Sequence, residues 1–213
     1  MDDLESTMAI EVLQGVEAIR RRPAMFLQGK DSSERLHWLV GQVLRAAALP
    51  THRNGARRIV VTLYKDEGLS ILDDGVGLPV EPVEYSGVHH PRLHVMMMTL
   101  FTGSQPTPEF YDLWGYLFLL GPIVAACSKK LTIKTIRAGA AYRVSFEEGG
   151  LTGLLGRAYG TEERGTRLTF SPSPTLFEGK TFDLGRLQEI VKQTRLESGV
   201  DISLEVQPSC RWD

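Results

Sequence analysis

A short apolar stretch that ends in Asp73, Asp74, Gly75 and Gly77 carries the clearest chemical pattern in the sequence. The pattern Ile-Leu-Asp-Asp-Gly-Val-Gly places a carboxylate at the end of a strand, and the glycines let the backbone turn sharply behind it. A carboxylate that only accepts hydrogen bonds can bind the exocyclic amine of adenine. Asp-Gly pairs also mark ordinary turns, and a plain turn is the commoner explanation of this motif when it stands alone.

A second group of candidate ligands contains His90 and His94, whose four-residue spacing on a helix could hold zinc. No cysteine or third ligand lies nearby in the sequence, and Pro91 favours a helix start that leaves His90 outside the helix. We therefore predict a surface histidine cluster and no metal site.

The composition limits the function classes that the chain can serve. Its 213 residues suffice for one core, and 24 Lys and Arg against 26 Asp and Glu give no overall signal for nucleic-acid binding. The two cysteines have no paired spacing, the first residues form no hydrophobic leader, and no apolar run approaches the ~20 residues that cross a bilayer. A cytoplasmic protein without a disulfide framework or membrane contact is expected.

The hydrophobic periodicity indicates which elements position Asp73. Helices are predicted over residues 10–19, from Ser32 or Ser33 to 49, over 92–101 with Met96 to Met98 in the core, and from Thr181 or Asp183 to 198. Strands are predicted over residues 58–64, 69–72, 131–136, 141–146, 166–170 and 200–206, with the first two in a hairpin and with loops over 79–91 and 149–163. Antiparallel strands with helices gathered elsewhere indicate an α/β two-layer sandwich, in a single domain over residues 1–213.

The order of these segments resembles the B subunit of DNA gyrase. Residues 11–26 resemble the opening of that subunit and residues 36–40 its next helix, and the match continues in register at residues 73–79, 128–131, 165–166 and 198–200. Several dispersed matches in the right order are more specific than one motif. The resemblance implies the Bergerat-type ATPase fold of gyrase, Hsp90, MutL and histidine kinases, with a mixed, largely antiparallel sheet. It is confined to the nucleotide-binding domain, so the transducer and cleavage domains are expected to be absent.

The resemblance also identifies positions where this chain departs from the family. In the family a glutamate activates the attacking water and an asparagine four residues later binds magnesium, and the aligned positions here are Gln42 and Ala46. A neutral amide cannot take a proton at pH 7, and a methyl group cannot bind a cation. Arg45 stands where the family tends to place an aspartate. We therefore expect no catalytic residue and no magnesium site.

The family's glycine-rich phosphate loop is altered as well. Aligned on Gly115, its second and third glycines become Phe118 and Leu120. Glycine is needed in such loops because successive backbone N–H groups turn toward the phosphates at dihedral angles that side chains disfavour. These bulky side chains are expected to cover an apolar surface, although a shifted loop that reuses Gly121 remains an alternative.

At the base end, the resemblance implies that Asp73, Gly75, Gly77 and Thr166 surround adenine and its bridging water. The sequence predicts a gyrase-B-like pseudo-ATPase that acts as a protein-interaction or regulatory module, with itself or gyrase components as partners, no expected cofactor and no direct DNA binding. The alternative is an ATP- or ADP-binding domain of a type II topoisomerase-like protein with residual or no hydrolysis, in which Arg45 takes the place of magnesium.

Overall fold

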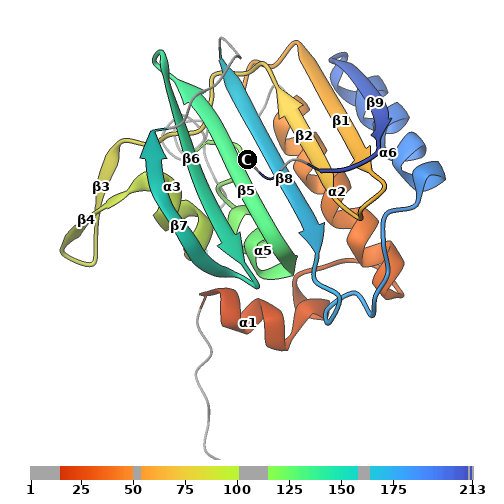
Figure 1. Ribbon diagram of the computed structural model, residues 1–213, viewed down its shortest axis with the longest axis horizontal. Helices are drawn as coiled ribbons and strands as arrows, with labels where there is room; N and C mark the ends of the chain where they lie inside the picture. The colour runs from red at the N-terminus through yellow and green to blue at the C-terminus, as the bar shows by residue number, and fades with distance from the viewer. Residues whose placement is uncertain (1–14, 50–53, 101–114, 158–163, 211, 213) are drawn as a thin grey trace, which may run out of the picture.

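The computed structural model describes residues 15–49, 54–100, 115–157, 164–210 and 212. One seven-stranded sheet forms the centre, in the spatial order β7 (Gly150–Arg157), β6 (Ala140–Glu147), β5 (Ser128–Arg137), β8 (Gly165–Pro172), β2 (Leu69–Asp73), β1 (Arg58–Tyr64) and β9 (Asp201–Gln207). Neighbouring strands are antiparallel except β1 and β9, which are parallel. Helices cover one face of the sheet (Figure 1). No described helix covers the other, which we call the open face, although Trp212 contacts Lys130 and Arg143 there. The predicted α/β two-layer sandwich with a mixed, largely antiparallel sheet is confirmed.

The helices of the second layer are short except for two. They are α1 (Gly15–Arg21), the 3-10 helix η1 (Pro23–Met25), α2 (Ser32–Ala48), α3 (Arg92–Met98), α5 (Gly121–Cys127) and α6 (Leu184–Ser198). The helix predicted over 10–19 is described only from Gly15 onward, and α3 ends three residues before its predicted limit. None of the described helices is long and apolar enough to cross a membrane.

Helix α2 begins after Asp31, whose side chain accepts a hydrogen bond from Glu34 N at 2.8 Å. The helix predicted from Ser32 or Ser33 begins at Ser32, and the carboxylate one residue earlier supplies its cap. Asp183 caps α6 as predicted, and His37 of α2 accepts a hydrogen bond from Asp183 N through Nε2 at 2.8 Å. The two long helices are therefore joined at the start of α6.

Two segments predicted as loops contain strands. Residues 79–91 hold the hairpin β3 (Pro82–Tyr85) and β4 (Val88–Pro91), whose turn residues Ser86 and Gly87 both have positive φ. Such a two-residue turn matches the twist of the flanking strands. Residues 149–163 hold β7, which pairs with β6 despite its three interior and terminal glycines because the edge position requires hydrogen bonds on one side only.

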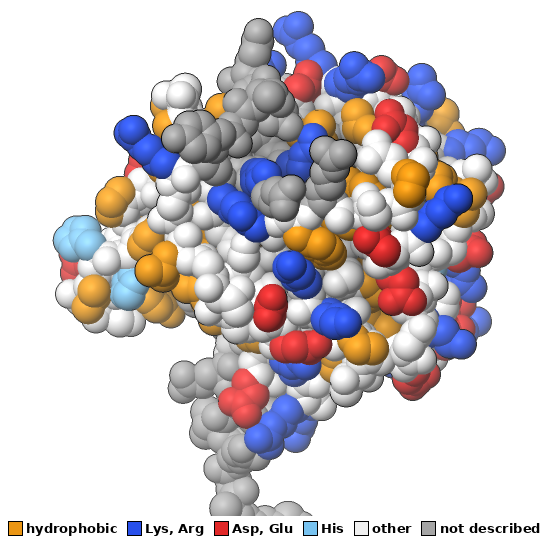
Figure 2. Space-filling view, viewed as in Figure 1, with side chains coloured by type: hydrophobic (Ala, Val, Ile, Leu, Met, Phe, Trp, Pro, Cys, Tyr) orange, Lys and Arg blue, Asp and Glu red, His pale blue; other side chains and the backbone are white. Residues whose placement is uncertain are grey.

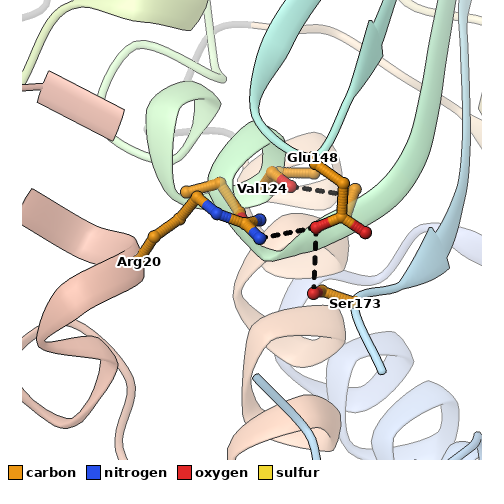
Figure 3. Close-up of polar contacts among 6 residues, drawn as sticks. Arg20, Val124, Glu148 and Ser173 are labelled. Carbon is orange, nitrogen blue, oxygen red and sulfur yellow. Dashed lines mark hydrogen bonds and ion pairs between the residues drawn. The ribbon is translucent and has the colours of Figure 1, made fainter. Parts of the chain in front are cut away.

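The lower end of the molecule is fixed by Arg20, one of the basic residues at the end of α1. Its Nη1 donates to Ala126 O at 2.8 Å, and its guanidinium pairs with Glu148 in the turn between β6 and β7 (Figure 3). Glu148 also accepts a hydrogen bond from Ser173 Oγ at 3.3 Å. The cation therefore ties α1 to α5 and to the sheet.

The core lies between the sheet and the helices. Met96 and Met97 are fully buried there, as predicted, whereas Met98 is exposed at the end of α3. Phe146 of β6 and Phe170 of β8 are the largest buried side chains of the sheet on this side. The side chain of Asp73 points into the same layer, because residues two apart on a strand share one face and the buried Ile71 lies two positions earlier in β2.

Candidate functional site

Asp73 ends β2 with its side chain almost fully buried, at 1% exposure. Its Oδ1 accepts a hydrogen bond from Gly75 N at 2.8 Å, so the carboxylate caps the turn that follows the strand. Thr166 is its direct neighbour on β8. The structure thus supports the structural interpretation of the motif while keeping the predicted adenine-binding residues side by side.

Tyr116 occupies the other oxygen of Asp73. Its hydroxyl donates to Asp73 Oδ2 at 2.8 Å, and the tyrosine is itself buried. Gly115 lets this segment pack closely against Pro79, because a Cβ at position 115 would lie only 2.8 Å from Pro79 Cδ. Sequence reasoning missed this contact, since nothing in the pattern near Gly115 indicates which way the tyrosine points. Both oxygens of the carboxylate are therefore bound by groups of the chain itself.

Burial controls the ionisation of this pair. It raises the pKa of Asp73 above its ordinary value, and hydrogen bonds from Gly75, Tyr116, Asn54 and Thr166 act in the opposite direction. Burial, followed by the nearby Asp73 charge, raises the pKa of Tyr116 well above its ordinary value. Tyr116 is therefore protonated at neutral pH and acts as the hydrogen-bond donor.

A hydroxyl pair closes the site beneath Asp73. Thr166 Oγ1 lies 3.1 Å from Thr135 Oγ1, and Thr135 Oγ1 accepts a hydrogen bond from Leu78 N at 2.7 Å. A Cβ on Gly77 would lie 2.2 Å from Ile136 O, so only glycine lets the turn approach β5 this closely. The structure therefore brings Gly77 and Thr166 together with Asp73, as the sequence predicted.

The segment aligned with the phosphate loop packs into the core. Leu117 and Phe118 are buried, at 0% and 4% exposure, and Leu120 is partly buried against the same cluster. Gly121 is the first residue of α5, where a Cβ would lie 2.8 Å from Met96 O. The preceding residues, 101–114, lie outside the described part of the chain. As expected, the described side chains cover an apolar surface.

The three altered positions on α2 separate into two environments. Ala46 is buried at 3% exposure and belongs to the core. Gln42 and Arg45 line an open groove of about 680 Å³ between α2 and α6. Arg45 donates to Glu197 Oε2 and Oε1 at 2.9 and 3.2 Å, and these bonds lower the pKa of Glu197. The structure holds Arg45 at α6 and does not place it among the hydrogen-bond partners of Asp73.

His90 and His94 lie in different environments. His90 lies exposed on β4, and His94 Nε2 accepts a hydrogen bond from Leu155 N at 3.0 Å. Burial and the neighbouring His90 lower the pKa of His94, which keeps Nε2 available as an acceptor. Within the described ranges, no three His, Cys, Asp or Glu side chains gather in a way that could hold a metal.

The comparisons with known proteins agree with the resemblance seen in the sequence. No protein-family model matches the chain. It is 32% identical to the B subunit of DNA topoisomerase 4 from Rickettsia prowazekii over 95% of this chain and 31% of that protein. It is 34% identical to the B subunit of DNA gyrase from Micrococcus luteus, over 92% of this chain and 27% of the relative. The B subunit of the type 2 topoisomerase from Aquifex aeolicus is 32% identical over 80% of this chain and 21% of that protein.

The chain spans about a third or less of the length of these curated relatives. Over most of its own length it is therefore gyrase-B-like. The similarity therefore does not assign the activity of the whole relatives to this chain.

Proposed function

We propose that this gyrase-B-like domain does not hydrolyse ATP and acts as a protein-interaction or regulatory module. The observation that carries the proposal is the hydrogen bond from the buried Tyr116 hydroxyl to Asp73. The family resemblance assigns this carboxylate to the adenine amine. In this chain a tyrosine hydroxyl donates to it instead.

Adenine binding would require Tyr116 to leave. A hydrogen bond to a charged group contributes about 1.5–3 kcal/mol, and the burial of an aromatic side chain contributes about the same again. Phe118 is buried two residues later and would be disturbed by the same movement. A loss of about 4 kcal/mol weakens an equilibrium roughly a thousandfold. The closed site therefore disfavours nucleotide binding even where the base-end residues are retained.

Hydrolysis would also lack its chemical groups. The resemblance aligns Gln42 with the general base and Ala46 with the magnesium ligand, and Ala46 is enclosed by the core. Helix α2 carries no acidic residue after Glu34. Beyond Glu34 this helix offers no carboxylate that could take a proton from water or bind magnesium, and its one amide side chain, Gln42, lines the groove beside α6.

Binding of a protein partner is the function that remains for this domain. The relatives are each named as one subunit of a topoisomerase or of DNA gyrase. This supports a partner that is a second copy of the chain or a component of such an enzyme. The proposal places regulation in contacts between proteins, with the closed site acting as a structural element.

A second candidate is an ATP- or ADP-binding domain with residual or no hydrolysis. The observation that favours it is the retained pairing of Asp73 and Thr166 across β2 and β8, with the close glycine turn beside them. In this case Tyr116 would be a displaceable group, and adenine would replace its hydroxyl on Asp73.

Titration calorimetry with ADP and a non-hydrolysable ATP analogue, with and without magnesium, separates the two. We expect no binding to the natural chain at millimolar ligand, and weak binding to Tyr116→Ala that is lost when Asp73→Ala is added. Tyr85→Ala, which removes an exposed tyrosine from β3, is the matched control. Circular dichroism establishes that each variant is folded, and Tyr116→Phe tests the hydroxyl with less loss of packing.

Binding of the analogue to the natural chain at micromolar concentration would favour the second candidate. A hydrolysis assay on Gln42→Glu combined with Ala46→Asn completes the test, since restoring these two groups is expected to give no turnover while the phosphate segment stays packed in the core. Measurable turnover in that double variant would reject the pseudo-ATPase proposal.

A further inference from the structure

A hydrogen bond joins helix α3 to β7, the edge strand of the central sheet (Figure 1). Leu155 N of β7 donates to His94 Nε2 at 3.0 Å, and both residues are partly buried. Strand β7 pairs with β6 on its other side. The edge of a sheet presents backbone groups that a protein has to cover or leave to other partners. His94 therefore covers one position of this edge.

The bond requires the neutral form of the imidazole. A neutral ring has one donor and one acceptor nitrogen, whereas the imidazolium ion has two donors. Because Nε2 accepts from Leu155 N, the ring proton lies on Nδ1. Protonation of Nε2 would set one N–H group against another and break the bond. An amide side chain could accept the same bond at every pH, so the histidine makes this contact depend on pH.

The surroundings of His94 oppose its protonation. Burial, followed by the nearby charge of His90, lowers the pKa of His94 below the ordinary value of 6.5. His89 and His90 are exposed on β4. Histidine side chains gather over the β3–β4 hairpin at the left of the molecule (Figure 2). The neutral ring is therefore the form that joins α3 to β7 at neutral pH.

The elements around α3 do not offer His94 a counter-ion. Besides His90, the ionisable or charged side chains on α3, β3, β4, α5 and β7 are Glu84, Tyr85, His89, Arg92, Cys127 and Arg157. Glu84 is opposite His89 on the hairpin, and Glu81, just before β3, pairs with Arg137. Among the described residues, neither carboxylate acts on the ring of His94. A charged ring would thus lose its hydrogen bond and gain no ion pair.

Helix α3 depends on such contacts for its position. It has seven residues, and its N-cap residue, Pro91, makes no side-chain hydrogen bond to it. A helix of this length is not stable in isolation. Its other side packs against the start of α5, where a Cβ on Gly121 would lie 2.8 Å from Met96 O. Loss of the bond at His94 would therefore loosen a short helix that has little stability of its own.

We propose that His94 is an acid-sensitive latch, which holds α3 against the edge of β7 when neutral and releases it when protonated. The ring is harder to protonate in the closed state than in the open state. The latch is therefore fully closed above pH 6.5, and it opens as the pH falls from 6.5 toward the lower pKa of the closed state. Opening exposes Leu155 N at the sheet edge. The inference goes beyond the proposed role of the Asp73 site and does not depend on it.

Amide hydrogen exchange followed by NMR, from about pH 7.5 to about pH 5, measures the opening of the latch at Leu155. In the natural chain the protection factor of this amide is expected to stay constant above about pH 7 and then to fall, by up to about tenfold per pH unit. In His94→Gln, whose side-chain oxygen accepts the bond without titrating, protection is expected to change by less than about twofold. The amide of Ile133 in the central strand β5 reports unfolding of the whole domain and should remain protected.

The matched control is His90→Gln, which removes the exposed neighbour and keeps the latch. The fall at Leu155 is expected to persist and to begin at a higher pH, because one cause of the lowered pKa of His94 is gone. An equal fall in His94→Gln, no fall in the natural chain, or a parallel fall at Ile133 would overturn the inference.

A titration of the natural chain tests the latch without any variant. The ring resonances of His94 and the amide resonance of Leu155 are expected to shift with one common midpoint below pH 6.5. Different midpoints for the ring and the amide would reject the latch, since they would show that protonation of His94 does not control this hydrogen bond.

Discussion

The two faces of the central sheet treat their charged groups in opposite ways. On the helix-covered face, Asp73 is buried and both of its oxygens accept hydrogen bonds from the chain, from Gly75 N and the Tyr116 hydroxyl. On the open face, Lys134 stands in a row of like charges and pairs with no acid among the described residues. The retained ligand-binding motif of the resemblance is satisfied internally, while the uncompensated charge lies where the resemblance assigns no site.

This difference shows how to weigh a retained motif. A buried polar group has to find a partner, because leaving it without one costs about 1–3 kcal/mol. Where the chain supplies that partner, retention is explained by folding and gives no information about a ligand.

The largest expected effect tests how tightly the closed face is built. Gly165 has φ +115 and a Cβ there would lie 1.9 Å from Asp73 O, whereas Gly139, with φ +76, has nothing within 4 Å. Gly165→Ala is expected to lower the free energy of unfolding by about 4 kcal/mol or more, or to prevent folding. Gly139→Ala is expected to cost only about 1–2 kcal/mol. Urea denaturation measures the free energy of unfolding of both variants. Equal losses would show that the turn after Asp73 can rearrange to accept a side chain at position 165.

The next effect isolates the hydroxyl on the carboxylate. Tyr116→Phe leaves the buried Asp73 oxygen without its donor and is expected to lower the free energy of unfolding by about 1–3 kcal/mol. Tyr64→Phe is the control on the open face, because the Tyr64 hydroxyl lies 3.2 Å from the neutral Ser70 hydroxyl. The control should lose about 1 kcal/mol or less. A smaller loss for Tyr116→Phe than for Tyr64→Phe would contradict internal satisfaction of Asp73.

Much of the fold was predictable because its signals are local. The hairpin of β1 and β2 follows from β-rich runs around a polar turn, and the end of α6 follows from Gly199, which has φ +71. The β3–β4 hairpin was missed because its strands are exposed on most positions and carry no apolar alternation. Strand β7 was missed because its glycines resemble a connection. Edge and exposed strands depend on pairing with distant residues, which periodicity does not report.

The candidate site was predictable only in its parts. The positions of Asp73, Gly77 and Thr166 followed from a motif and a family order, and β2 and β8 bring them together. The contact between Tyr116 and Asp73 joins residues 43 apart, and it depends on how the segment after Gly115 packs. Lys134 of β5, Arg143 of β6 and Arg167 of β8 are likewise distant in the sequence, and only the strand register shows that they are neighbours.

The pH dependence of stability provides a third test of the closed face. Because the folded-state pKa of Tyr116 is raised above 10.0, its contribution is complete below that pH and is lost as pH rises toward the folded pKa. Above pH 10.0 the free energy of unfolding is expected to fall faster in the natural chain than in Tyr116→Phe, by up to about 1.4 kcal/mol per pH unit. Urea denaturation from about pH 9 to pH 11 measures both proteins. Parallel curves would mean that Tyr116 ionises freely in the folded state.

The smallest effect concerns Arg45, the cation predicted to replace magnesium. Its pair with Glu197 is partly exposed, with 37% and 33% of the two side chains accessible, so Arg45→Ala is expected to lower the free energy of unfolding by less than about 1 kcal/mol. Salt at about 1 M should remove most of the difference from the natural chain. Glu197→Gln should give a similar loss, and the double variant should lose less than the sum.

Lys134→Ala completes the comparison of the two faces. It removes the middle charge of a like-charged row, so the free energy of unfolding at low salt is expected to stay unchanged or to rise by a few tenths of a kcal/mol. If the change in the free energy of unfolding has opposite signs for Arg45→Ala and Lys134→Ala, then Arg45 stabilises the fold and Lys134 does not. A loss of several kcal/mol at Lys134 would instead show that its charge is paired within the chain.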